Sequence, residues 1–221
     1  MKKKTVAVFT TTRADFYILE NLLLRLKKSK NVNLDLFVGG THLKKAFGET
    51  INDITPTFKN EIKLFDYLQP GDLAEDIANS MSMALKISSQ LFKKHKPDLV
   101  ILLGDRYEIL SIASAALISN IPIAHIHGGE VTQGAIDDAF RHSITKMSNY
   151  HFVSTSEHKK RVIQLGEKRS NVFNFGAPAL ENLKNTKIIS KNLLSDFLNL
   201  NVNKPYFLAT FHPVTYQTDG D

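Results

Sequence analysis

Acidic, basic and imidazole side chains gather after two apolar segments of this sequence, and they carry most of the chemistry the chain could perform. The two segments are Leu99–Leu103 and Ile123–Ile126. The side chains that follow or overlap them are Asp105, Arg106, Glu108, His125, His127, Glu130, Asp137, Asp138 and His142. Carboxylates and imidazoles suit proton transfer at neutral pH, and they also suit binding of a metal ion.

Asp105 is the strongest single candidate for an acid or a base. It follows five residues without a polar side chain, so its carboxylate should lie at the end of a buried strand. Burial and hydrogen bonding both alter the acidity of a carboxylate, and either suits acid or base work. The alternative interpretation is a structural ion pair between Asp105 and the neighbouring Arg106.

The histidines at 125 and 127 alternate with Ile126, so on a strand they would share one face. With Glu130, Asp137 and His142 nearby they could bind zinc or manganese. The same residues could instead perform metal-free acid–base chemistry, or form a hydrogen-bonded network that holds the loop at Gly128. The residue types leave these three interpretations open.

Strand and helix patterns alternate through the first 180 residues. We expect strands at 5–10, 33–38, 61–64, 99–103, 123–126, 152–154 and 172–175. We expect helices after Ala14, from 72 to 94, from 108 to 119, from 135 to 147 and from 159 to 165, the last with Ser156 as its N-cap. This alternation predicts an α/β fold with a doubly wound parallel sheet.

The C-terminal part of the sequence differs in residue composition. Residues 1–180 are predicted to form one domain, and residues 181–204 a polar linker with a helical stretch near its end. A new strand is expected from Tyr206 to Phe211, so that residues 205–221 would begin a second, truncated domain.

In an open parallel sheet, ligands bind in the crevice at the carboxyl ends of the strands. The candidate residues lie there, including Arg13 after the first strand and His42 after the second. The turn from Thr10 to Arg13 could bind phosphate through hydroxyls, an arginine and a helix N-terminus, or it could be structural. No GxGxxG, GxxxxGK[ST] or GxSxG motif is present, which disfavours a dinucleotide cofactor, an ATPase phosphate loop and a serine hydrolase elbow.

The composition is that of a soluble globular protein. The 221 residues include 28 basic and 22 acidic side chains and no cysteine, which excludes disulfides, thiolate zinc sites and a cysteine nucleophile and fits a cytoplasmic location. The basic residues are scattered as short pairs, which does not predict nucleic-acid binding but suits an anionic substrate. The apolar stretch 109–126 is interrupted by Asn120 and Pro122, so we interpret it as a helix and a strand, and no membrane association is predicted.

Five motifs resemble one known family. They are TTTRAD at 10–15, GGTHL at 39–43, GDRYE at 104–108, HIHGGEVTQGAIDDAFRHSITK at 125–146 and FHPVT at 211–215. In this order they are similar to the hydrolysing UDP-N-acetylglucosamine 2-epimerases of sialic acid biosynthesis. The resemblance implies two Rossmann-like domains facing each other across a cleft (the GT-B arrangement), of which this chain supplies the first half.

The resemblance also implies a reaction and the residues that perform it. UDP is eliminated to give a 2-acetamidoglucal, and water then adds to give N-acetylmannosamine, with no metal or redox cofactor. The implied catalytic residues are Asp105, Asp137, His127 and Glu130, and the implied substrate-binding residues are Arg13, His42, Arg106, His142 and His212. The family favours homo-oligomers, and its second domain provides much of the UDP contact, so this chain alone is expected to be inactive.

One position departs from the family's pattern. Members of the family carry a catalytic glutamate where this sequence has His127, and an imidazole differs from a carboxylate in charge at neutral pH. The change is compatible with a different substrate, such as UDP-2,4-diacetamido-2,4,6-trideoxyglucose on the route to legionaminic acid. Two functions of other classes remain as alternatives: a metal-dependent hydrolase that uses His125 and His127, and a non-catalytic nucleotide-sugar binding module.

Overall fold

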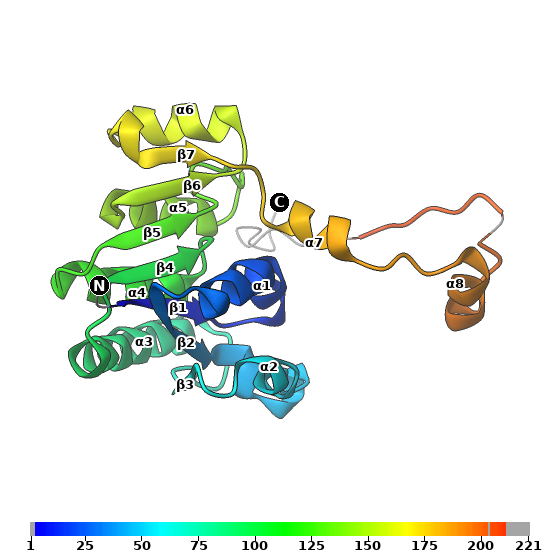
Figure 1. Cartoon of the computed structure of the whole chain (residues 1–221), viewed down its shortest axis with the longest axis horizontal. Coiled ribbons are helices and arrows are strands. Elements are labelled where there is room, and N and C mark those ends of the chain that lie inside the picture. Colours follow the sequence, from blue (N-terminus) through cyan, green and yellow to red (C-terminus); the bar gives the residue numbers. More distant parts are fainter. Residues whose placement is uncertain (1–2, 203, 211–221) are drawn as a thin grey trace.

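A computed structural model describes residues 3–202 and 204–210. It contains one parallel sheet with the strand order β3-β2-β1-β4-β5-β6-β7 (Figure 1). The strands are β1 (Lys4–Thr10), β2 (Val32–Gly39), β3 (Ile62–Phe65), β4 (Leu99–Leu103), β5 (Ile123–Ile126), β6 (Tyr150–Val153) and β7 (Val172–Asn174). All seven expected strands are confirmed, and each strand end lies within two residues of the expected position.

The helices alternate with the strands. They are α1 (Arg13–Lys28), α2 (Ile51–Phe58), α3 (Ala74–His95), α4 (Tyr107–Ile118), α5 (Asp137–Met147), α6 (Ser156–Gln164), α7 (Ala179–Asn185) and α8 (Lys191–Leu198). The sequence patterns did not predict α2 or α7. The N-cap of α6 is Thr155, whose hydroxyl accepts a hydrogen bond from the amide of His158, and not Ser156 as expected.

Apolar side chains alternate between the two faces of the sheet, and each face has its own helices. Phe9 of β1 belongs to a core with α3, α4 and α5, whereas the adjacent Val8 belongs to a second core with α1 and α2. Val162 of α6 packs on the β6 and β7 end of the sheet. Helices on both faces confirm the doubly wound, Rossmann-like fold.

The strand order reverses between β1 and β4, and this reversal determines where a ligand binds. From β1 the chain proceeds to β2 and β3 on one side, and from β4 it proceeds to β5, β6 and β7 on the other. The connections leave the sheet in opposite directions at such a switch point and open a crevice beyond the carboxyl ends of the two strands. The segments Thr10–Arg13 and Gly104–Arg106 therefore lie next to each other.

The C-terminal segment differs in part from the expectation. Helix α7 packs beside α1, where Arg25 forms an ion pair with Glu181, and α8 lies apart from the sheet (Figure 1). The expected strand from Tyr206 is wrong for residues 206–210, which are not in a strand, and Phe211 lies outside the described residues. The physical reason is that a strand needs a partner for its backbone hydrogen bonds, and these residues have none within the described chain.

The apolar stretch 109–126 is a helix followed by a strand, as predicted. Helix α4 ends at Ile118 and β5 begins at Ile123. No helix within the described residues is both long enough and apolar enough to span a bilayer.

Candidate active site

A cleft of about 360 Å³ lies at the switch point between β1 and β4. It brings together four of the residues singled out from the sequence, namely Asp105, Arg106, His127 and Glu130, together with Asp15 of α1 and Arg141 of α5. Three carboxylates, an imidazole and two guanidinium groups thus share one concave surface. Such a surface can transfer protons and bind an anion.

Local structure after β4 fixes the position of Asp105. Gly104 has a φ of +78°, in the left-handed region, and its amide donates to the carbonyl of Ile126 at 3.0 Å. This turn directs the Asp105 carboxylate into the cleft, where it forms an ion pair with the buried Arg141. The partner of Asp105 is therefore Arg141 and not Arg106, which corrects the alternative considered from the sequence.

Arg141 is a site residue that the sequence reasoning missed. Its side chain is only 6% exposed, and besides Asp105 it binds the hydroxyl of Thr132 at 2.9 Å and lies 3.5 Å from Asp138 Oδ1. A signal for it was present, because Arg141 precedes the buried Ile144 by three positions on an amphipathic helix. An arginine on the apolar face of a helix requires a buried partner.

Arg106 is held at the cleft by a fully buried carboxylate. Its Nε donates to Glu108 Oε1 at 2.7 Å, and Glu108 has no exposed side-chain surface. Burial alone would lower the pKa of Arg106, but the charge and hydrogen bond of Glu108 raise it above its ordinary value. Arg106 therefore provides a fixed positive charge beside Asp105.

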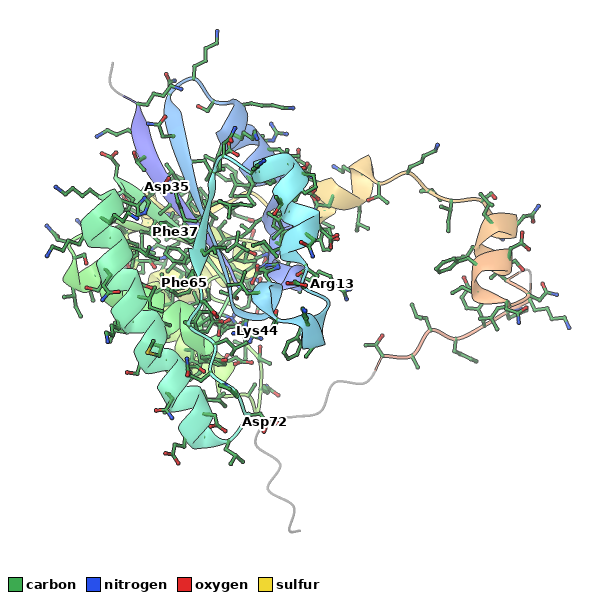
Figure 2. All side chains as sticks on the ribbon, turned by 90° about the horizontal axis from the view of Figure 1, so that it is seen from below. Arg13, Asp35, Phe37, Lys44, Phe65 and Asp72 are labelled. Atoms are coloured by element: carbon green, nitrogen blue, oxygen red, sulfur yellow. The ribbon has the colours of Figure 1, made fainter. Side chains whose placement is uncertain are left out.

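The turn before α1 is occupied by a carboxylate of the chain itself. Asp15 Oδ2 accepts hydrogen bonds from the amides of Thr11 and Thr12 at 3.0 and 2.9 Å, and Thr12 caps α1 in a reciprocal capping box. These amides are the donors a phosphate would have used, so the structure favours the structural interpretation of this turn. Arg13 is exposed on the first turn of α1 (Figure 2).

Three further predicted residues do not line the cleft. His42 is fully buried. Its Nε2 lies 2.9 Å from Thr10 Oγ1 and its Nδ1 lies 2.7 Å from Thr50 Oγ1, so it supports the turn after β1. His142 Nε2 lies 3.6 Å from Asp138 Oδ2, and the side chain of Asp137 has no hydrogen bond or ion pair within the described residues. His212 lies outside the described residues.

His125 and His127 do not act as a pair. Strand β5 ends at Ile126, and His127 has a φ of +66°, so the chain turns between the two rings. His125 is buried, and its Nε2 and Nδ1 are 2.8 Å from the carbonyl of Gly104 and 3.2 Å from Thr145 Oγ1. Both ring nitrogens of His125 have partners within the protein, so the geometry does not favour the interpretation in which the two imidazoles bind one ion. The described residues include no group of three histidines or carboxylates arranged to hold a metal.

The buried His125 predicts a pH-dependent stability. Burial lowers its pKa from 6.5 to about 4, against the opposing effect of its hydrogen bond to Gly104. The unfolded chain takes up this proton near pH 6.5, whereas the folded protein does so only near pH 4, so stability falls as the pH drops between these values. We expect a loss on the order of 3 kcal/mol from this residue.

A glutamine substitution tests this expectation, because the amide of His125→Gln can still donate toward Gly104. Urea unfolding at pH 7.5 and 4.5 should show a smaller loss of stability in the variant than in the unchanged protein. His42 and His151, whose pKa values burial also lowers, are common to both proteins. Equal losses in the two proteins would contradict the prediction.

His127 forms a close contact with Glu130. Its Nδ1 lies 2.5 Å from Glu130 Oε1, while its Nε2 is buried and has no hydrogen-bond partner within the described residues. Burial alone would raise the pKa of Glu130, but hydrogen bonds from His127 and Ser154 and the nearby imidazoles lower it below its ordinary value. An ionised carboxylate on one ring nitrogen leaves the other nitrogen as the proton-accepting atom.

The fold is an open parallel α/β sheet, and carboxylates, an imidazole and two arginines lie together at its switch point. A sequence profile of the UDP-N-acetylglucosamine 2-epimerase family matches residues 24–221. The chain belongs to this family.

Individual relatives agree with the profile. The chain is 42% identical over 215 residues to the GDP/UDP-N,N'-diacetylbacillosamine 2-epimerase (hydrolyzing) of Campylobacter jejuni, covering 97% of this chain and 56% of the relative. It is 42% identical to the polysialic acid biosynthesis protein P7 of Escherichia coli, covering 98% of this chain and 55% of that protein. The chain thus spans about half the length of these relatives.

The fold agrees with a solved structure. The crystal structure of UDP-GlcNAc 2-epimerase from Neisseria meningitidis bound to UDP-GlcNAc superposes with a TM-score of 0.71 at 22% identity. The superposition covers 90% of this chain and 54% of that one. At this identity the likeness establishes the fold.

Proposed function

We propose that this chain is the catalytic first half of a hydrolysing 2-epimerase that converts UDP-N-acetylglucosamine to N-acetylmannosamine and UDP. The observation that carries the proposal is the cleft in which Asp105 and His127 face the same space beside Arg106 and Arg141. Inversion at C2 requires a proton to leave one face of the sugar and another to arrive from the opposite face. Two proton-transferring groups on one cleft meet that requirement.

The proposed reaction has two steps. In the first, a base removes the C2 proton, the C1–O bond breaks with its electron pair leaving on UDP, and a 2-acetamidoglucal forms. In the second, an acid delivers a proton to C2, water adds its hydroxyl to C1, and the remaining proton of the water passes to a base or to solvent. We assign these two proton transfers to Asp105 and His127, with Glu130 holding His127.

Positive charge assists the departure of the diphosphate. Arg106 is kept charged by Glu108 at the cleft, and Arg13 is exposed on the neighbouring turn. Cations near a leaving diphosphate stabilise the charge that develops in the transition state. From the resemblance we assign Arg13, His142 and His212 to substrate binding and Asp137 to catalysis. His42, being buried, would act by supporting Thr10.

The remaining contacts to UDP are proposed to come from a second Rossmann-like domain, of which residues 205–221 would be the beginning. This proposal rests on the resemblance and on the length of the relatives, since the chain covers 56% of the Campylobacter enzyme. The 221-residue chain alone should bind UDP weakly and turn nothing over. The full-length enzyme is proposed to be a cytoplasmic homo-oligomer that needs no metal or redox cofactor.

A second substrate is favoured by a specific observation. A larger cavity of about 740 Å³ adjoins the cleft, and Thr12 and Arg106 line both. Figure 2 shows two of its lining residues, Lys44 and Asp72, below the core residues Phe37 and Phe65. Its apolar lining includes Phe47 and could hold an additional acylamino group. Together with the name of the Campylobacter relative, this supports a UDP-2,4-diacetamido-2,4,6-trideoxyglucose epimerase as the alternative.

Direct assay with both sugars tests the proposal. The full-length protein should release UDP from UDP-N-acetylglucosamine with free N-acetylmannosamine as the second product, in buffer containing EDTA. A kcat/KM about 10-fold higher for the diacetamido sugar would replace the first substrate by the second, since pocket contacts of this size discriminate by that order. Tight binding of both sugars without UDP release would instead indicate a non-catalytic binding module.

A further inference from the structure

Two residues outside the cleft contact the carboxylate that holds His127. Ser154, directly after β6, donates its hydroxyl hydrogen to Glu130 Oε1 at 2.8 Å. The same hydroxyl oxygen lies 2.8 Å from Nδ1 of His158 on α6. The Glu130 oxygen that accepts from Ser154 is also the oxygen that contacts His127 Nδ1.

The chemistry of these groups determines the direction of each hydrogen bond. An ionised carboxylate only accepts, so the hydrogen of Ser154 is directed to Glu130. The serine oxygen can then accept, so His158 Nδ1 is the donor to Ser154. Glu130 therefore receives hydrogen bonds from Ser154 and from His127 Nδ1, and the proton of a neutral His127 is on Nδ1.

Helix α6 contacts the loop that carries His127 and Glu130. Arg161 donates to the carbonyl of Gly129 at 2.5 Å, and a Cβ at Gly129 would lie 2.6 Å from the carbonyl oxygen of His158. Gly129 has a φ of +79° and His127 a φ of +66°, so both residues are in the left-handed region, which residues with a Cβ rarely adopt. The contacts with α6 maintain this shape.

We propose that Ser154 and His158 are positioning residues that hold Glu130 on His127 Nδ1 and leave His127 Nε2 as the atom that exchanges a proton with the substrate. The assignment of His127 to proton transfer rests on the proposed function. Neither Ser154 nor His158 lines the cleft, so both act through Glu130 and His127.

Other charged groups lie near His127 or its loop and are the same in every variant of the test below. They are Asp15 of α1, Asp105 and Arg106 after β4, His125 of β5, Arg141 of α5 and Arg161 of α6. His158 Nδ1 lies 3.8 Å from Glu130 Oε1, so it contributes to the charge at that carboxylate directly as well as through Ser154.

Removing the hydroxyl should lower the kcat of the full-length enzyme. In Ser154→Ala, Glu130 is held less firmly on His127 Nδ1, so His127 Nε2 is directed less well at the substrate. A displaced reactive group costs about 10- to 100-fold in kcat, with little change in KM. His158→Phe should act in the same direction, whereas Ser154→Thr and His158→Asn, which retain the hydroxyl and a donor, should stay near the unchanged enzyme.

Two comparisons separate positioning from simple packing. Ser154→Ala should have no additional effect in a Glu130→Gln background, because the three residues act as one unit. The exposed Ser170→Ala is the matched control and should leave kcat and KM unchanged. An unchanged kcat in Ser154→Ala, or an equal loss of kcat in the Glu130→Gln background, would overturn the proposal.

A measurement that needs no turnover tests the proton position itself. Long-range ¹H–¹⁵N spectra of the full-length protein, recorded on the neutral form of His127, should show Nδ1 protonated and Nε2 unprotonated. The opposite tautomer would overturn this inference even in an enzyme that releases UDP. An enzyme that releases no UDP, with the expected tautomer, would instead overturn the proposed function and leave the geometry intact.

Discussion

Replacing Asp105 with asparagine is expected to lower turnover of the full-length enzyme by about 100- to 10,000-fold, the usual contribution of a positioned acid or base. The amide is nearly the same size as the carboxylate and can still accept a hydrogen bond from Arg141, so the fold should persist. The change removes the negative charge of Asp105 and with it the ability to take and return a proton. Steady-state kinetics of UDP release, with circular dichroism to monitor folding, measures both effects.

Asp53→Asn is the matched control for Asp105. Asp53 is exposed in the first turn of α2, away from the cleft, and its substitution should leave kcat and KM unchanged. A folded Asp105→Asn enzyme with the turnover of the unchanged protein would remove Asp105 from catalysis.

Replacing Arg141 with methionine is expected to have the second largest effect. Arg141 connects Asp105, Thr132 and Asp138 from a buried position on α5, so its loss leaves the Asp105 carboxylate without its fixed orientation. Turnover should fall about 100-fold. The folded state should lose roughly 1–3 kcal/mol, because partly buried polar groups lose their partner.

A double-mutant cycle tests whether Asp105 and Arg141 act as a unit. The Asp105→Asn/Arg141→Met enzyme should be little slower than Asp105→Asn alone, since the orientation of a carboxylate no longer matters once it is gone. Multiplicative losses in kcat would show that Arg141 serves turnover independently of Asp105.

The fold could be predicted because each strand is recognisable from its own residues. Leu99–Leu103 and Ile123–Ile126 are short, apolar and bounded by turns, as expected for strands that are covered on both faces of a sheet. Helix α2 was not predicted because Pro56 lies within it and threonines flank the proline, which argues against a helix. It forms because Ile54 and Phe58, four positions apart on one face, pack on the core with α1.

The candidate site was only partly predictable for a related reason. Asp105 and His127 follow strand ends, so topology alone brings them to one edge of the sheet. The partner of Asp105 is 36 residues away on α5, and Ser154 reaches Glu130 from the following strand. Such contacts depend on how helices and strands pack against each other, which the sequence does not show. His42 was predicted at the cleft because it follows a strand end, but its side chain is fully buried.

Deuterium incorporation tests the central claim most directly. The full-length protein is incubated with UDP-N-acetylglucosamine in deuterated water, and the free sugar is examined by NMR. Elimination followed by hydration predicts that UDP is released and that the N-acetylmannosamine product carries deuterium at C2. Release of UDP with hydrogen retained at C2 would contradict the account.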